Sequence, residues 1–114
     1  MELFNLTEEK YPTLKDLYRA TTGTFKIASL EGVKYDDIVE VFGEPSIAQE
    51  SGDGKIQFEW VLAIGDDVFT IYDWKTFDRD YTLNKLEVWS VGGKGPNYEF
   101  CELLRRSFKT AVVL

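Results

Sequence analysis

The sequence predicts an α+β fold, in which an antiparallel sheet of about four to five strands has two or three helices packed on one face and its other face solvated. Three observations lead to this prediction. Apolar and polar residues alternate from Lys55 to Trp74 on both sides of a short turn, which is typical of a β-hairpin. Apolar residues recur at helical spacing before this hairpin and after Pro96. No linker or repeat divides the 114 residues, so we expect a single globular domain, residues 1–114.

The part of the chain before the hairpin is expected to alternate helix, strand and helix. Pro12 suits the first turn of a helix that Thr21-Thr22-Gly23 would end. Residues 24–30 alternate in the manner of a short strand, which could lie at an edge of the sheet. Residues 34–42 have helical spacing, with aspartates in the first turn and Gly43 directly after the last turn.

The remaining elements surround or follow the hairpin. Residues 47–50 are compatible with a short strand, and Gly65-Asp66-Asp67 is the hairpin turn. Residues 76–83 are expected to form a loop, and residues 85–91 the last strand of the main sheet. A helix is expected from Pro96 onward, because proline is tolerated in the first turn. The apolar tail that follows it could dock as a strand or fray.

Composition and charge narrow the class of protein. Aromatic residues make up 15% of the chain, which is typical of a folded domain. The formal net charge of −7 disfavours direct binding of nucleic acid, which needs a basic surface. It suits a basic protein partner, and the alternative is that it serves solubility alone. The chain has no histidine, which excludes histidine-dependent catalytic triads and histidine metal sites. We therefore expect a protein that is not an enzyme and that carries no cofactor and no metal.

Cysteine usage and the N-terminus predict a cytoplasmic protein. The single cysteine, Cys101, cannot form an intramolecular disulfide, as expected in a reducing compartment. It also lacks an activating histidine, so we expect a small, partly buried residue. The N-terminus has no signal-peptide pattern, and no apolar run reaches the roughly 20 residues that span a bilayer.

The register of the hairpin decides which aromatic residues face outward. A two-residue turn would place Trp60 across from Ile71, and Tyr72 and Trp74 would then share the other face with Glu59. On a solvated face they would form a partner-binding patch, because Trp and Tyr are enriched at binding hot spots. The alternative is that these aromatic residues belong to the core or are covered by the N-terminal helix.

Acidic residues gather on and beside the predicted helix 34–42. They could imitate the phosphates of a nucleic acid and bind a host protein that has a basic surface. The alternative is a solvated helix face. The predicted partner-binding residues here are Asp36, Asp37 and Glu40.

A glycine-rich turn precedes the last predicted helix. Backbone amides at such a junction can bind an anion, and a lysine in the turn would add positive charge. The alternative is a tight turn with a structural role only. The predicted anion-binding residues are Gly92, Gly93, Lys94 and Gly95.

Three aspartates follow the hairpin at Asp73, Asp78 and Asp80. Carboxylates can hold a hard cation such as Ca²⁺. Their spacing does not match the twelve-residue calcium loop, so we interpret the segment as a solvated loop and predict no metal site.

Several short segments resemble a family of small phage-encoded proteins, most of which have no assigned function. The resemblance covers roughly Ile27 to Gly93 and implies an accessory protein, a class whose members often block host proteins, including defence systems such as CRISPR effectors. The order of helix, Gly-x-Pro and strands is also similar to the repeating unit of β-lactamase inhibitor proteins, as an architectural analogy. The segments are Phe42-Gly43-Glu44-Pro45, Gly54-Lys55, Glu59-Trp60, Thr70-Ile71-Tyr72-Asp73-Trp74-Lys75 and Trp89-Ser90-Val91-Gly92-Gly93.

Together these patterns lead to one functional prediction and one alternative. The prediction is a non-enzymatic phage accessory protein that binds and inhibits a host protein, of the anti-defence or anti-CRISPR type. The alternative is a protein that sequesters a small ligand, such as a nucleotide signal, at the glycine-rich turn. An enzyme that works with carboxylates ranks last, because no acid–base pair stands out.

Overall fold

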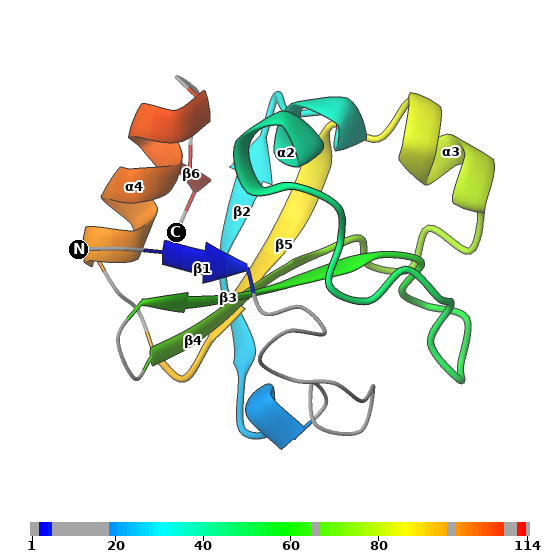
Figure 1. The fold of residues 1–114 in the computed structure, drawn as a ribbon. Coiled ribbons are helices and arrows are strands. Elements are labelled where there is room, and N and C mark those ends of the chain that lie inside the picture. Colours follow the sequence, from blue (N-terminus) through cyan, green and yellow to red (C-terminus); the bar gives the residue numbers. More distant parts are fainter. Residues whose placement is uncertain (1–2, 6–18, 65–66, 96–97, 109–111, 114) are drawn as a thin grey trace.

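The computed structural model describes residues 3–5, 19–64, 67–95, 98–108 and 112–113. These residues form an antiparallel sheet with the strand order β1-β3-β4-β5-β2-β6 and helices packed against it (Figure 1). Four strands of six or seven residues, β2 to β5, make up the body of the described sheet, and the short strands β1 and β6 extend it. The predicted α+β class is therefore confirmed. The strands are β1 (Leu3–Asn5), β2 (Phe25–Glu31), β3 (Glu59–Ile64), β4 (Asp67–Tyr72), β5 (Val88–Gly93) and β6 (Val112–Val113), and the helices are α2 (Tyr35–Phe42), α3 (Arg79–Asn84) and α4 (Tyr98–Phe108).

The structure determines the register of the β3–β4 hairpin, which the sequence leaves open. Ile64 pairs with Asp67 across a two-residue connection, and Trp60 consequently pairs with Ile71. Because side chains alternate along a strand, this register directs Trp60 to one face and Glu59 to the other.

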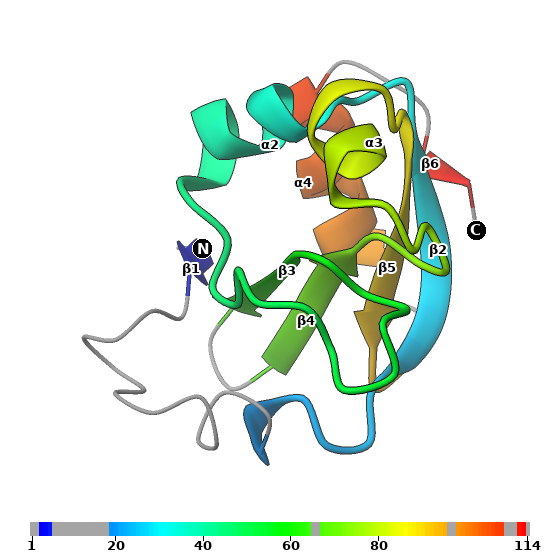
Figure 2. The same cartoon turned by 90° about the vertical axis from the view of Figure 1, so that its right-hand side faces the viewer.

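The main core lies between the sheet and the helices, which gather on one side of it (Figure 2). Trp60 and Trp89 are fully buried there, with their rings 5.5 Å apart in an edge-to-face arrangement. Each indole N–H has a backbone acceptor: Trp60 Nε1 donates to Gly43 O at 2.9 Å, and Trp89 Nε1 donates to Val33 O at 2.8 Å. These bonds join the segments on both sides of α2 to the centre of the sheet. The buried helix residues of this core are Ile38, Phe100, Cys101 and Leu104.

Helix α2 begins and ends as predicted. Asp37 accepts a hydrogen bond from the backbone N–H of Lys34 at 2.9 Å, which satisfies a donor at the start of the helix. Gly43 has φ of 87° and donates to Val39 O at 2.8 Å. A glycine is favoured at this position because other residues rarely adopt a positive φ.

The prediction of a loop at residues 76–83 is wrong. Residues Arg79–Asn84 form α3, whose first turn is capped by the Asp78 carboxylate accepting from the Tyr81 N–H at 3.1 Å. The helix has a single buried residue, Thr82, and so lacks the apolar stripe by which sequence patterns are recognised.

Three predictions about the strands also differ from the structure. In the segment 47–50, Ile47 forms an isolated bridge to Glu59 in place of a strand. The strand predicted at 85–91 begins at Val88 and continues through Gly93. The strand near residue 25 is not at the edge, because β6 pairs with it, which also shows that the C-terminal tail docks as a strand.

The expectation that the second face of the sheet is solvated is also wrong. Val61 is 0% exposed and Thr70 is 1% exposed, although both point away from the helices. Ile47 packs with Val61 and Ala63 into a second, smaller cluster, because the segment after α2 crosses this side of β3. Alternate residues of β3 therefore enter two different buried clusters, one on each face of the sheet.

Two other expectations concern the chain ends. The helix predicted from Pro12 lies outside the described residues, apart from its last residues near Gly23. The C-terminal helix is confirmed as α4, and Cys101, expected to be partly buried, is fully buried in it.

Candidate protein-binding surface

Three large aromatic side chains lie exposed at the end of the sheet where β4 leads into α3. Trp74 is 48% exposed and Phe77 is 61% exposed in the connecting segment, and Tyr81 on α3 is 44% exposed. We call these residues, Trp74, Phe77 and Tyr81, the aromatic corner. Exposed aromatic side chains of this size are characteristic of binding hot spots.

The segment that carries the aromatic corner is fixed by the buried carboxylate of Asp73, which is 0% exposed. Asp73 Oδ1 accepts hydrogen bonds from the backbone N–H groups of Gln57 at 2.8 Å and Phe58 at 2.9 Å. Asp73 Oδ2 accepts from the hydroxyls of Thr76 at 2.7 Å and Thr82 at 2.9 Å. This carboxylate is therefore fully engaged within the fold. The exposed carboxylate of Asp78 caps α3.

The backbone between Trp74 and α3 is strained. Lys75 has φ of 56° and Phe77 has φ of 53°, in the left-handed region that costs a residue with a side chain about 1 kcal/mol. The Lys75 N–H donates to Lys55 O at 2.8 Å, and the Phe77 ring lies near Gly54 in the facing turn. Strain that the surroundings maintain is typical of functional segments.

Arg79 joins the start of α3 to the residues that precede β3 in the sequence. Its guanidinium lies 4.1 Å from the centre of the Phe58 ring and donates to Ala48 O at 2.6 Å. Together with the Asp73 hydrogen bonds, these contacts hold both ends of the segment that presents Phe77. The aromatic corner is therefore preorganised.

Two lysine ammonium groups lie beside the Trp74 ring, although the chain as a whole is acidic. Lys55 Nζ lies 5.5 Å and Lys75 Nζ lies 5.7 Å from the centre of the Trp74 ring, within the range of cation–π attraction. The Tyr72 ring meets the Trp74 ring edge to face, with centroids 6.2 Å apart. The indole is thus held between an aromatic neighbour and two ammonium groups.

Glu59 and Tyr72 are paired across β3 and β4, on the sheet face opposite the helices. Burial, with a smaller effect from the negative charge of Asp73, raises the pKa of Glu59 from 4.5 to about 7. Burial, followed by the charge of Glu59, also raises the pKa of the Tyr72 hydroxyl. The two predicted binding residues on the strands are thus partly buried, whereas Trp74 beyond the strand end is exposed.

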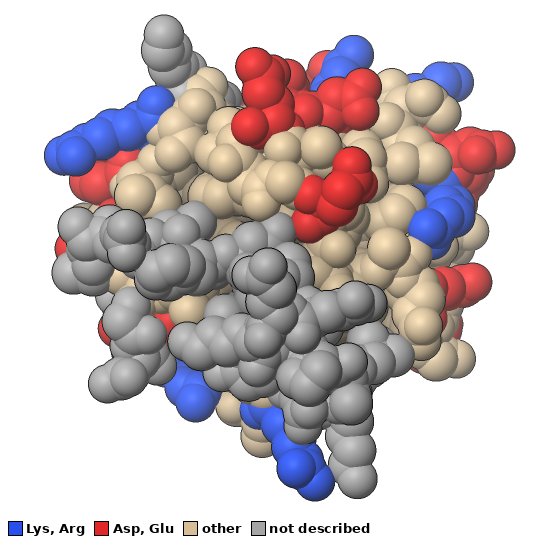
Figure 3. All heavy atoms as spheres, in the orientation of Figure 1, with Lys and Arg blue, Asp and Glu red and all other residues tan. Residues whose placement is uncertain are grey.

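The predicted acidic residues lie on a different side of the molecule. Asp36, Asp37 and Glu40 are exposed on α2, and Figure 3 shows acidic side chains gathered over this helix. Asp37 and Glu40 also line a groove of about 410 Å³ beside the end of α4. Because α2 packs on the helix face of the sheet, the structure does not bring these carboxylates together with Glu59 and Tyr72.

The predicted anion-binding turn has a different structural explanation. Gly92 and Gly93 are paired residues of β5, and only Lys94 and Gly95 lie in the described part of the turn. A Cβ at Gly92 would collide with Thr70 Oγ1, and a Cβ at Gly93 would lie 3.1 Å from a carbon of Phe69. Close packing therefore accounts for both strand glycines.

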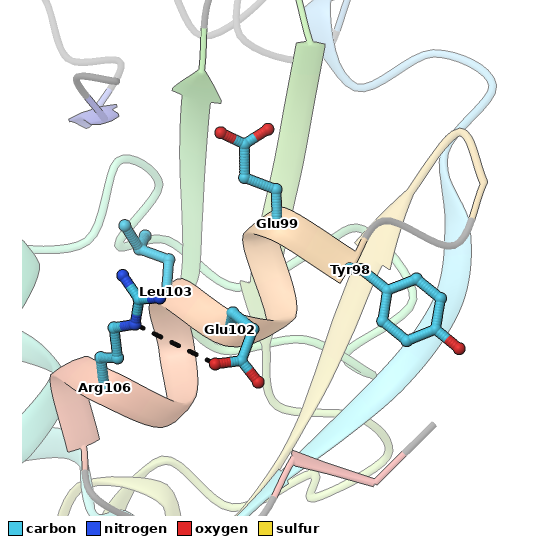
Figure 4. A pocket seen from close by; sticks show the side chains of 5 residues that line it. All are labelled: Tyr98, Glu99, Glu102, Leu103 and Arg106. Atoms are coloured by element: carbon cyan, nitrogen blue, oxygen red, sulfur yellow. Dashed lines mark ion pairs between the residues drawn. The ribbon is translucent and has the colours of Figure 1, made fainter.

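A shallow pocket of about 470 Å³ lies along the outer side of α4 (Figure 4). Glu102 and Arg106 form an ion pair of 4.0 Å there, and Glu102 also receives a hydrogen bond from Arg105 at 3.1 Å. The opposite charges in this pocket are thus satisfied by one another. The side chains that line it are Tyr98, Glu99, Glu102, Leu103 and Arg106.

Sequence reasoning identified Trp74 but missed its neighbours. The exposure of Phe77 could have been suspected, because this aromatic residue lies inside a polar, aspartate-rich segment that has no apolar periodicity. The proximity of Lys55 and Lys75 to the Trp74 ring follows from the facing turn, whose position the sequence pattern does not define.

Comparison with known protein families, curated proteins and solved structures finds no match for this chain. The functional assignment must therefore come from the chemistry of the surface itself. Within the described ranges, no helix combines the length and the apolar character needed to cross a membrane.

Proposed function

We propose that this chain is a non-enzymatic binding protein that attaches to a host protein through the aromatic corner and inhibits it. The observation that carries the proposal is the exposure of Trp74 and Phe77 on a segment that Asp73 holds from within. Anchors that are already ordered lose little conformational entropy on binding, so more of their contact energy contributes to affinity.

The resemblance to small phage-encoded proteins gives this proposal its biological setting. An accessory protein of the anti-defence type, such as an anti-CRISPR protein, acts by occupying a surface that its target needs. The exposed carboxylates of α2 and the net charge of −7 would accelerate association with a basic, nucleic-acid-binding target in the cytoplasm of the host. In this proposal the aromatic corner provides affinity and α2 provides steering.

The alternative, sequestration of a nucleotide-like ligand at the glycine-rich turn, gains no support from the fold. Two of the four glycine-turn residues, Gly92 and Gly93, lie in the strand ladder against Thr70 and Phe69.

The proposal is tested by pull-down of the tagged full-length chain from host-cell extract, followed by an activity assay of the captured protein. We expect one stoichiometric partner, whose activity falls when the chain is added, and loss of both effects in Trp74→Ala. Tyr98→Ala is a matched control, because Tyr98 is 77% exposed on α4, away from the aromatic corner.

Two results would decide against the proposal. Capture of the same partner by Trp74→Ala at undiminished affinity would exclude the aromatic corner as the anchor. Capture without any loss of the partner's activity would exclude inhibition. The steering role is tested separately with Asp36→Lys/Glu40→Lys, which should slow association and leave dissociation unchanged.

A further inference from the structure

The chemistry around Trp74 says what kind of segment the aromatic corner can bind, an inference that rests on the proposed function. The chain as a whole is acidic, yet the groups nearest to this indole are two ammonium groups. The charge of the whole chain and the charge of the groups closest to this indole thus have opposite signs. Contact chemistry is determined by the local groups, because the field of distant charges is screened within about 10 Å.

The lysines beside Trp74 have unused donor capacity. Lys75 is exposed, and no carboxylate pairs with it among the residues that the structure describes. Lys55 has one carboxylate neighbour, Asp53, at the long distance of 3.9 Å. Each ammonium has three N–H donors, and contact with a ring face satisfies none of them by a conventional hydrogen bond.

Three of the nearby carboxylates, those of Asp53, Asp73 and Asp78, already accept hydrogen bonds within the fold. Asp53 Oδ1 accepts from Ser51 Oγ at 2.8 Å and from the Lys55 N–H at 3.1 Å. Asp78 caps α3, and the Asp73 carboxylate is enclosed with four donors. The two ammonium groups therefore have N–H donors to offer a visiting molecule, and they lie beside the exposed Trp74 ring.

We infer that the aromatic corner binds a short acidic segment of a partner protein, in which an Asp or Glu side chain lies next to an apolar one. The carboxylate would accept hydrogen bonds from Lys55 and Lys75, and the apolar neighbour would pack on Trp74 and Phe77. Such a contact combines charge complementarity with an aromatic anchor.

The first test measures the local potential with small ions as probes. Trp60 and Trp89 are 0% exposed, so collisional quenching of fluorescence reports mainly on Trp74. We expect the ratio of iodide to caesium quenching to be about twofold higher than for free N-acetyltryptophanamide, since a positive site concentrates anions. Lys75→Glu should bring this ratio to or below that of the free compound, whereas Lys94→Glu, the same charge change at the other end of the sheet, should leave it raised. A wild-type ratio equal to that of the free compound would overturn the inference.

The second test identifies the bound segment with a library of short random peptides, selected on the immobilised full-length chain. We expect enriched peptides to contain Asp or Glu beside an aromatic or aliphatic residue, and Lys75→Glu to weaken them roughly tenfold, with Lys94→Glu unchanged. Enrichment of neutral or basic peptides would overturn the inference. So would tighter binding of a mixed-sequence single-stranded DNA, because aromatic residues with nearby lysines also bind unstacked bases.

Trp74→Ala separates this inference from the proposed function. If Trp74→Ala abolishes binding of the selected peptides and Lys75→Glu does not, the aromatic corner remains the binding site and the acidic segment is excluded. If neither substitution affects binding, the aromatic corner is excluded as well.

Discussion

Asp73 accepts a hydrogen bond from the Thr82 hydroxyl at 2.9 Å, and this bond joins the end of β4 to α3. The same carboxylate binds the backbone N–H groups of Gln57 and Phe58, which precede β3. One buried side chain thus connects three segments that are distant in sequence and supports the aromatic corner between them. A buried carboxylate of this kind is stabilising only while its partners remain in place.

We predict that Asp73→Ala lowers the free energy of unfolding by about 3 kcal/mol, because two buried amides and two hydroxyls lose their acceptor. Asp73→Asn should cost less, since its carbonyl oxygen can still accept from Gln57 and Phe58. Urea denaturation of the two variants measures the difference. Asp80→Asn is the control and should change stability by less than about 0.5 kcal/mol, because Asp80 is exposed. Equal stability of Asp73→Ala and Asp80→Asn would contradict this role of Asp73.

We predict that the protein is more stable at pH 5 than at pH 8, by on the order of 2 kcal/mol, because of Glu59. The pKa of Glu59 is about 7 in the folded chain and near its ordinary value of 4.5 in the unfolded chain. Unfolding between these values therefore releases a proton, so the free energy of unfolding falls as the pH rises and levels off above pH 7. The sequence has no histidine to titrate in the same window.

Glu59→Gln provides the control for this pH dependence. The glutamine is neutral at every pH, so the stability of the variant should be nearly constant between pH 5 and pH 8. Urea titrations at several pH values make the comparison. A decline of the same size in Glu59→Gln would show that another group is responsible.

The hairpin could be predicted from sequence, because the alternation of β3 and β4 identifies the strands and a short polar turn lies between them. Its register could not, since a one-residue change in the turn reverses the buried face, and the structure determines it by pairing Trp60 with Ile71. The same alternation was misinterpreted on the second face, where Val61 and Ala63 are apolar and buried. Apolar residues on both faces of a strand are typical of a strand that is covered on both sides.

The aromatic corner could be predicted only in part, for physical reasons. The sequence proposed Trp74 for a solvated sheet face, whereas it is exposed beyond the end of β4, and α3 depends on a cap from Asp78 and on the long-range bond between Thr82 and Asp73. Phe77 is exposed because of a left-handed backbone that residue preferences disfavour. Conformations that tertiary contacts impose against local preference leave little trace in the sequence.

We predict that Trp89→Phe destabilises the fold by about 2–3 kcal/mol. The substitution removes the indole N–H that Val33 O accepts at 2.8 Å, and it leaves a cavity beside Trp60. Trp74→Phe is a matched control with the same chemical change at an exposed position, and its effect should be below about 0.5 kcal/mol. Thermal and urea unfolding of both variants test this prediction, and equal effects would mean that the bond to Val33 contributes little.

We predict that Gly92→Ala destabilises the protein by roughly 2 kcal/mol through overpacking, because the added methyl group would collide with Thr70 Oγ1 and lie 3.4 Å from the Tyr72 ring. Removing the hydroxyl should relieve this collision, so in a Thr70→Ala background the cost of Gly92→Ala should fall by about 1 kcal/mol. A double-mutant cycle measured by urea denaturation gives this coupling energy. Gly52→Ala is the control, because its added methyl group would meet no atom within 4 Å and should have little effect. Full additivity of Gly92→Ala and Thr70→Ala would mean that the steric conflict lies elsewhere. Coupling of the expected sign would identify Gly92 as the residue that lets β4 and β5 pack closely on the second face of the sheet.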